Sequence, residues 1–125
     1  MIRVLIIDDS SLTREFHSHI VKDAGFACVT AVDGMDWLEK ATSERFQIIL
    51  TDINMQGMDG YEFIRRARQN PDYDEVPIII ISTEAKELDK QKGFTAGANL
   101  YLAKPTDADR IVESMKMLLG KRGGL

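Results

Sequence analysis

The sequence predicts an α/β fold in which helices cover both faces of one parallel sheet. Three short runs of isoleucine, valine and leucine, at residues 4–7, 48–50 and 78–81, are typical of strands buried on both faces. Segments with helical spacing of apolar residues separate them, so strand and helix alternate along the chain. For 125 residues this favours a doubly wound, flavodoxin-like (βα)5 fold with strand order 2-1-3-4-5.

The first helix is expected between the first strand and Gly25, a residue type that commonly ends helices. Its core-facing side chains are expected to be Leu12, Phe16, Ile20, Val21 and Ala24. His17 lies at the border of this stripe and His19 lies outside it, so both are expected at the surface. Residues 26–32 suit an edge strand, on which Cys28 would be buried filler.

The later helices begin at side chains that can cap a helix N-terminus. Asp33 precedes a helix that would bury Trp37, and Asp59 precedes the next helix with Glu62 at capping-box spacing. Residues 84–96 are poor in apolar residues, so a helix there would be thinly buried and available to a partner. After an edge strand at residues 100–103, Thr106 is expected to cap the last helix. The core face of that helix would be Ile111, Val112, Met115, Leu118 and Leu119.

Composition limits the class of protein. With 44% hydrophobic and 29% charged residues, the chain is expected to form one globular domain over residues 1–125, with no output domain and a short basic tail at 120–125. No apolar run is long enough for a membrane span, no signal peptide is evident, and one cysteine cannot form an internal disulfide. We therefore expect a cytoplasmic protein. The net charge of −4 argues against direct nucleic-acid binding.

Charged and hydroxyl residues follow four of the five expected strands. The first strand ends in Asp8 and Asp9, the third in Asp52, the fourth in Ser82 and Thr83, and the fifth in Lys104. The carboxyl ends of parallel strands meet at one edge of a sheet, where open α/β folds place their sites. Alone, each of these side chains would be a helix cap or a solvated charge. Their joint placement on strands about 4.8 Å apart indicates a functional site.

The acidic residues of this cluster predict a metal ion. Three carboxylates so close together repel one another unless a proton or a cation joins them. An oxygen-only ligand set favours Mg²⁺, or Mn²⁺, over zinc. Asp8, Asp9 and Asp52 with Lys104 sum to a charge of −2, which one divalent ion neutralises. Such a cluster suits phosphoryl transfer, with the central Asp52 as the nucleophile that forms an aspartyl phosphate.

At these residues the sequence resembles the response-regulator receiver domain, and within that family the stand-alone, CheY-like chemotaxis regulators. The resemblance covers nearly the whole chain. It is carried by Val-Leu-Ile-Ile-Asp-Asp-Ser at 4–10, Thr-Asp-Ile-Asn-Met at 51–55, Met-Asp-Gly at 58–60, Ile-Ile-Ser-Thr-Glu-Ala at 80–85 and Tyr-Leu-Ala-Lys-Pro at 101–105.

The resemblance implies a role for each matching residue, with Asp52 as the phosphoacceptor. The implied metal ligands are Asp9, Asp52 and the backbone carbonyl of Asn54, with Asp8 acting partly through water. The other implied site residues are the phosphate-pairing Lys104, the switch hydroxyl Ser82, the switch aromatic Tyr101 and the cis-proline Pro105. In the switch that the resemblance implies, the Tyr101 ring turns from solvent toward the core after phosphorylation.

Two positions depart from the family pattern. Gln56 stands where the family usually has proline, which should loosen the loop slightly without touching a ligand. Thr83 stands where a small residue is usual, so its β-branched side chain could restrict the inward path of Tyr101 or slow phosphoryl access. Spacing to Lys104 favours Ser82 over Thr83 as the phosphate donor.

The resemblance implies a two-component response regulator rather than an enzyme with turnover. Its expected partners are a sensor histidine kinase of the chemotaxis type and a downstream protein such as a flagellar motor switch protein. A phosphorelay intermediate or a phosphate sink would show the same features. A Mg²⁺-dependent aspartyl phosphatase fits less well, because its Asp-x-Asp pair and cap insertion are missing. A flavin-binding module would need a first loop that binds the flavin phosphate. The negative charges of Asp8 and Asp9 in this loop would instead repel a phosphate.

Overall fold

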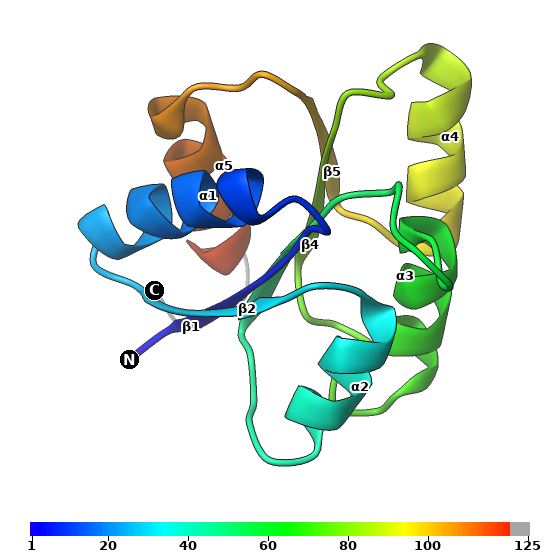
Figure 1. Cartoon of the computed structure of the whole chain (residues 1–125), viewed down its shortest axis with the longest axis horizontal. Coiled ribbons are helices and arrows are strands. Elements are labelled where there is room, and N and C mark those ends of the chain that lie inside the picture. Colours follow the sequence, from blue (N-terminus) through cyan, green and yellow to red (C-terminus); the bar gives the residue numbers. More distant parts are fainter. Residues whose placement is uncertain (121–125) are drawn as a thin grey trace.

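The computed structural model describes residues 1–120, in which strands and helices alternate as the sequence predicts (Figure 1). The strands are β1 (Arg3–Ile7), β2 (Ala27–Ala31), β3 (Ile48–Thr51), β4 (Ile78–Ser82) and β5 (Leu100–Ala103). The helices are α1 (Ser11–Asp23), α2 (Gly34–Ala41), α3 (Gly60–Gln69), α4 (Glu87–Ala96) and α5 (Ala108–Gly120). Lys121 and Arg122 of the predicted basic tail lie outside the described residues.

All five strands run parallel in one sheet of order β2-β1-β3-β4-β5, which confirms the predicted topology. Ile7, the last residue of β1, pairs with Ala31 at the end of β2 and with Thr51 at the end of β3. Ser82 pairs with Ala103 at the matching end of β4 and β5. The residues that follow β1, β3, β4 and β5 therefore come together at one edge of the sheet.

Helices cover both faces of the sheet, with α1 and α5 on one side and α2, α3 and α4 on the other (Figure 1). Alternate strand residues supply the two cores, as expected when successive side chains point to opposite faces. Leu5, Ile49 and Ile80 face the core that contains Trp37 and Phe63. Val4, Leu50 and Ile79 are among those that face α1 and α5, and the predicted face of α5 is buried there except for the half-buried Val112.

Helix α1 is rotated relative to the prediction. Its buried residues are His17, Ile20 and Val21, whereas Leu12 and Phe16 are 77% and 53% exposed. A surface helix buries only a narrow stripe of side chains. His17 lies three residues before Ile20 and four before Val21, so it falls on the same stripe one turn earlier. The prediction that Leu12 and Phe16 face the core and that His17 lies at the surface was therefore wrong.

The helix caps agree with the sequence at two of the three predicted starts. Asp33 and Asp59 accept hydrogen bonds from backbone N–H groups in the first turns of α2 and α3, and Ser10 caps α1 in the same way. The prediction that Thr106 caps α5 was wrong. The carboxylate of Asp107 caps this helix instead, accepting from Arg110 N at 2.8 Å, and the buried Thr106 hydroxyl has no hydrogen-bond partner in the structure.

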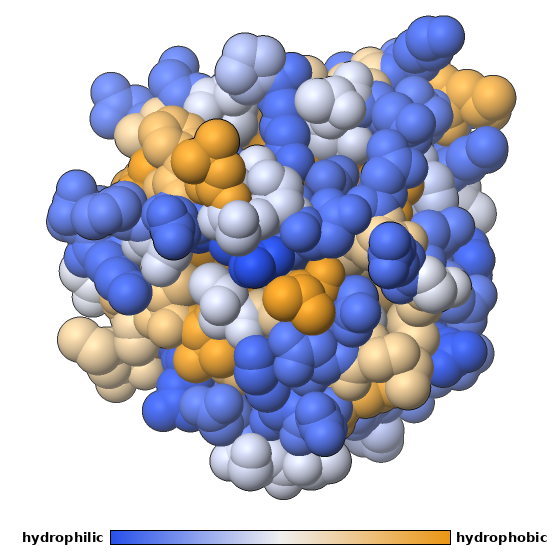
Figure 2. All heavy atoms as spheres, viewed as in Figure 1, coloured by the Kyte–Doolittle hydropathy of each residue, from blue (hydrophilic) through white to orange (hydrophobic). Residues whose placement is uncertain are grey.

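Figure 2 shows separate apolar patches among hydrophilic atoms on one face of the molecule. The large apolar side chains most exposed on the helices include Leu12, Phe16, Leu88, Phe94 and Met117. Helix α4 buries only Gly93 and Ala96, as expected for a thinly covered segment. Among residues 1–120, none of the helices combines the length and the apolar character needed to cross a membrane.

Candidate functional site

Three carboxylates come together at the edge of the sheet where the strands end. One oxygen each from Asp8, Asp9 and Asp52 lies within 4.8 Å of the others. Asp8 is buried, Asp52 is half-buried and Asp9 is exposed to solvent. The clustering predicted from the strand order is thus present, with access from solvent on the Asp9 side.

Lys104 reaches back across β4 to this cluster. Its Nζ donates to Asp8 Oδ2 at 2.8 Å and to Asp52 Oδ2 at 3.0 Å. Burial alone would lower the pKa of Lys104, but the hydrogen bonds and negative charges of Asp8 and Asp52 outweigh it and raise the pKa. The ammonium group therefore stays charged and partly balances the three carboxylates.

The backbone around Asp52 fixes the direction of its carboxylate. Its other oxygen, Oδ1, accepts from Ile53 N at 2.6 Å, and its own N–H donates to Ile7 O at 3.0 Å. Helix α3 begins directly against this turn, because a Cβ on Gly60 would lie 2.3 Å from the Asp52 carbonyl oxygen. Only glycine allows so close an approach, a constraint that the sequence analysis missed although Asp59-Gly60 is part of a matching stretch.

The donor set fits a hard divalent cation. Asp8, Asp9 and Asp52 offer only oxygen atoms, which Mg²⁺ prefers, and the exposed Asp9 leaves room for the waters that Mg²⁺ usually retains. With Lys104 the four side chains carry a charge of −2, which the ion would cancel. Asn54 is exposed in the loop after β3, close in sequence to Asp52.

Ser82, Glu84 and Tyr101 form a hydrogen-bonded group beside the acidic cluster. The fully buried Ser82 Oγ accepts from Glu84 N at 3.1 Å, and the Tyr101 hydroxyl donates to Glu84 O. The Tyr101 ring is 8% exposed, so it already faces inward, not outward as expected for the starting position. Burial, followed by its contact with Tyr61, raises the pKa of the Tyr101 hydroxyl, which remains protonated and able to donate.

A hollow of about 290 Å³ lies on the other side of Lys104, and Thr83, Pro105 and His17 line part of it. The Lys104–Pro105 peptide bond is cis, as the resemblance implies. Thr83 is exposed in this hollow while Tyr101 lies inward, so Thr83 does not exclude the inward ring. Burial, followed by the nearby Lys104 charge, lowers the pKa of His17, which favours a neutral imidazole.

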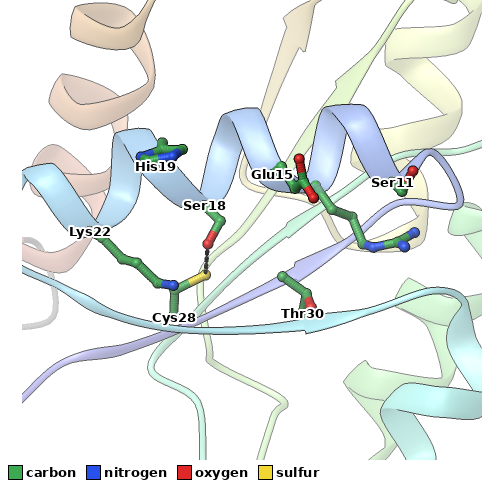
Figure 3. Close-up of a pocket in the computed structure, with 8 residues that line it drawn as sticks. Ser11, Glu15, Ser18, His19, Lys22, Cys28 and Thr30 are labelled. Carbon is green, nitrogen blue, oxygen red and sulfur yellow. Dashed lines mark hydrogen bonds between the residues drawn. The ribbon is translucent and has the colours of Figure 1, made fainter.

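A second hollow, of about 450 Å³, lies between α1 and β2 (Figure 3). Arg14 lines it and also donates to Asp8 O at 2.6 Å. Cys28 lines it and accepts from the Ser18 hydroxyl at 3.5 Å. Cys28 is half-buried and packs against the core on the α1 side, so it fills space there as predicted but is less buried than expected. Burial raises the pKa of its thiol, which keeps the sulfur protonated and poorly nucleophilic.

Comparison with known families gives a match to the response regulator receiver domain over residues 4–116. Protein PilG of Pseudomonas aeruginosa is 32% identical over 92% of this chain and 85% of its own length. Some relatives are much longer. The chain spans 13% of the gliding motility regulatory protein of Myxococcus xanthus, to which it is 37% identical over 103 residues.

Solved structures resemble the whole described fold. The chemotaxis response regulator CheY4 of Vibrio cholerae has a TM-score of 0.88 and 36% identity, covering 94% of this chain and 98% of that chain. The receiver domain of sensor histidine kinase PA1611 from Pseudomonas aeruginosa has a TM-score of 0.87 and 25% identity, covering 94% of this chain and 97% of that one. The latter structure has a magnesium ion coordinated in its active-site cleft.

Proposed function

Because the chain belongs to the response regulator receiver domain family and is CheY-like, we propose that it is a signalling switch phosphorylated on Asp52. The observation that carries this proposal is the joint placement of Asp52, two further carboxylates and Lys104 at one edge of the sheet. A sensor histidine kinase is the proposed donor, and a change in protein binding is the proposed output.

In the proposed reaction an Asp52 carboxylate oxygen attacks phosphorus, and the bond between phosphorus and the donor breaks. The donor atom, a histidine nitrogen or the oxygen of a small acyl phosphate, leaves with the bonding electron pair. Lys104, already 3.0 Å from Asp52 Oδ2, would pair with an oxygen of the new phosphoryl group. The chain itself would thus catalyse its own modification, without the multiple turnovers of an enzyme.

Mg²⁺ is the proposed cofactor, with Mn²⁺ as a substitute. Its ligands would be Asp8, Asp9, Asp52 and the Asn54 carbonyl, and Asp8 would act partly through water. When bound, the ion would neutralise charge on the phosphoryl oxygens. The magnesium ion in the similar receiver domain of PA1611 supports this assignment.

The switch would begin at the Ser82 hydroxyl. A phosphoryl oxygen would draw Ser82 away from Glu84 N and strengthen the inward position of Tyr101. A hydrogen bond to a charged group contributes about 1.5–3 kcal/mol, so Ser82 and Lys104 together could favour the active state by about 3–6 kcal/mol. Nearly complete switching requires about 5.5 kcal/mol, so these contacts have the required size.

The readout surface would consist of α4, β5 around Tyr101, and α5. Leu88 and Phe94 on α4 and Met117 on α5 are exposed there, as a protein-binding surface requires. Similarity to the chemotaxis regulator CheY4 favours a chemotaxis-type kinase as the source of phosphate and a flagellar motor switch protein as the target. The proposed location of the chain is the cytoplasm.

The test is phosphorylation by acetyl phosphate with and without Mg²⁺, followed by intact-mass measurement. The wild-type chain should gain one phosphoryl group only with Mg²⁺, and Asp52→Ala should gain none. Asp74→Ala is the matched control, because Asp74 is exposed and precedes β4, at the opposite end of that strand from Ser82. Labelling that persists in Asp52→Ala would mean that the nucleophile is another residue.

A further inference from the structure

Two tyrosines from different elements donate to backbone carbonyls at the start of α4. The Tyr101 hydroxyl on β5 donates to Glu84 O, just before α4. The Tyr61 hydroxyl on α3 donates to Asp89 O at 3.2 Å, in the first turn of α4. Helices α3 and α4 lie side by side, so Tyr61 bridges the two helices next to the switch aromatic (Figure 1).

The Tyr101 ring packs against α4, the helix that Tyr61 contacts. An added Cβ on Gly93 of α4 would lie 2.9 Å from Tyr101 Cδ2. Tyr101 is buried in the core that includes Ala96 of α4, and Tyr61 packs against the same core. The inward ring therefore rests on the helix whose first turn the Tyr61 hydroxyl holds.

We propose that Tyr61 is a positioning residue that holds Tyr101 inward by fixing the first turn of α4, the helix against which the Tyr101 ring packs. The consequence for signalling rests on the proposed function, in which inward Tyr101 favours partner binding. The chain would then populate the inward ring before any phosphoryl group arrives. Tyr61 would set how far phosphorylation can still raise the fraction of molecules with Tyr101 inward. The half-buried Tyr61 side chain also lines the groove between α3 and α4.

The test measures the position of the Tyr101 ring directly, without Mg²⁺ or a phosphodonor. The chain has three tyrosines, so labelling with 3-fluorotyrosine gives three ¹⁹F signals, and the H₂O-to-D₂O shift of each reports exposure of its ring. Tyr61→Phe removes only the bridging hydroxyl. Tyr73→Phe is the matched control, because it removes a hydroxyl that donates to Glu44 O in the other half of the fold. Gly93→Ala is expected to displace the ring outward, because its Cβ would lie 2.9 Å from Tyr101 Cδ2, and it serves as the reference variant.

In Tyr61→Phe the outward fraction of Tyr101 should rise about twofold to tenfold, the change in an equilibrium that one hydrogen bond produces. Tyr73→Phe should leave the Tyr101 signal where it is in the wild type. An unchanged Tyr101 signal in Tyr61→Phe, or an equal change in both variants, would overturn the inference. Failure of acetyl phosphate to modify Asp52 would instead remove the proposed function and leave this measurement valid.

Discussion

Lys104 Nζ lies 2.8 Å from Asp8 Oδ2 and 3.0 Å from Asp52 Oδ2, so one ammonium group joins the ends of three strands. The Lys104 side chain is 16% exposed and that of Asp8 is 3% exposed, which makes this ion pair largely shielded from solvent. The same group is the one that would move to a phosphoryl oxygen on Asp52. Stability and the proposed switching would therefore depend on the same cation.

Replacing Lys104 by methionine keeps much of the aliphatic stem and removes the charge. Without Mg²⁺ we expect the free energy of unfolding to fall by about 1–3 kcal/mol, because the buried Asp8 carboxylate loses its positively charged partner and keeps only the hydrogen bond from Ser10 N. Millimolar Mg²⁺ should recover most of this loss, since the ion neutralises the same carboxylates. Urea unfolding with and without MgCl₂ measures both effects.

The control for that experiment is Lys40→Met. Lys40 pairs with Asp36 at 3.2 Å in a more exposed position, away from the acidic cluster. Its replacement should change stability by less than about 1 kcal/mol and should not respond to Mg²⁺. A loss in Lys104→Met that Mg²⁺ does not reduce would contradict the shared role of Lys104 and the ion.

Asp9 offers a clean test of metal binding because it is exposed and its loss should not disturb the core. Mg²⁺ at 100 times its Kd should stabilise the wild type by about 2.7 kcal/mol. In Asp9→Asn we expect at least about a tenfold weaker affinity, which removes about 1.4 kcal/mol of this effect. Isothermal titration calorimetry and thermal unfolding measure it, with Asp74→Asn as the control. Equal Mg²⁺ affinity in both variants would exclude Asp9 as a ligand.

The sequence was sufficient for the sheet order and for the acidic cluster, because both follow from patterns that repeat along the chain. Buried strands are continuous apolar runs, and parallel strands bring the residues after them together. The direction of Lys104 could also be expected, since its side chain is long enough to cross β4. These features depend on where residues lie along the backbone, and little on side-chain packing.

Features that depend on tertiary packing were not predictable in the same way. Periodicity located the apolar face of α1 only to within one residue. Phe16 was therefore predicted to be buried and His17 to be at the surface, whereas the structure has the reverse. The inward ring of Tyr101 packs against Gly93 of α4 and its hydroxyl donates to Glu84 O, contacts that form only when β5 and α4 come together in the fold. Thr106 and Asp107 are both good caps, and only the backbone geometry after Pro105 decides between them.

The corrected cap of α5 can be tested by stability alone. Asp107→Ala should lower the free energy of unfolding by about 1 kcal/mol, because the Arg110 N–H loses its acceptor. Thr106→Val should be neutral or stabilising, since it removes a buried hydroxyl that has no partner in the structure and keeps the side-chain shape. Chemical denaturation of both variants measures the difference. If Thr106→Val lowers the free energy of unfolding more than Asp107→Ala does, Thr106 and not Asp107 caps α5.

His17 should make stability depend on pH near neutrality. Its pKa is lowered in the folded chain, chiefly by burial and then by Lys104, while the charges of Asp8 and Asp52 act in the opposite direction. In the unfolded chain the pKa returns to about 6.5, so below that pH the unfolded state binds more protons than the folded state. Stability should therefore fall as the pH decreases from about 6.5 toward the lower folded pKa, by at most about 1.4 kcal/mol per pH unit.

The variants that test this are His17→Gln and His19→Gln, compared by urea unfolding between pH 7.5 and 5.5 without Mg²⁺. His17→Gln should reduce the slope of stability against pH, whatever it does to stability at pH 7.5. His19 lies on the exposed side of the same helix, so His19→Gln should keep the wild-type slope. If His17→Gln keeps the wild-type slope, the buried imidazole does not change its protonation on unfolding, and another group causes the pH dependence.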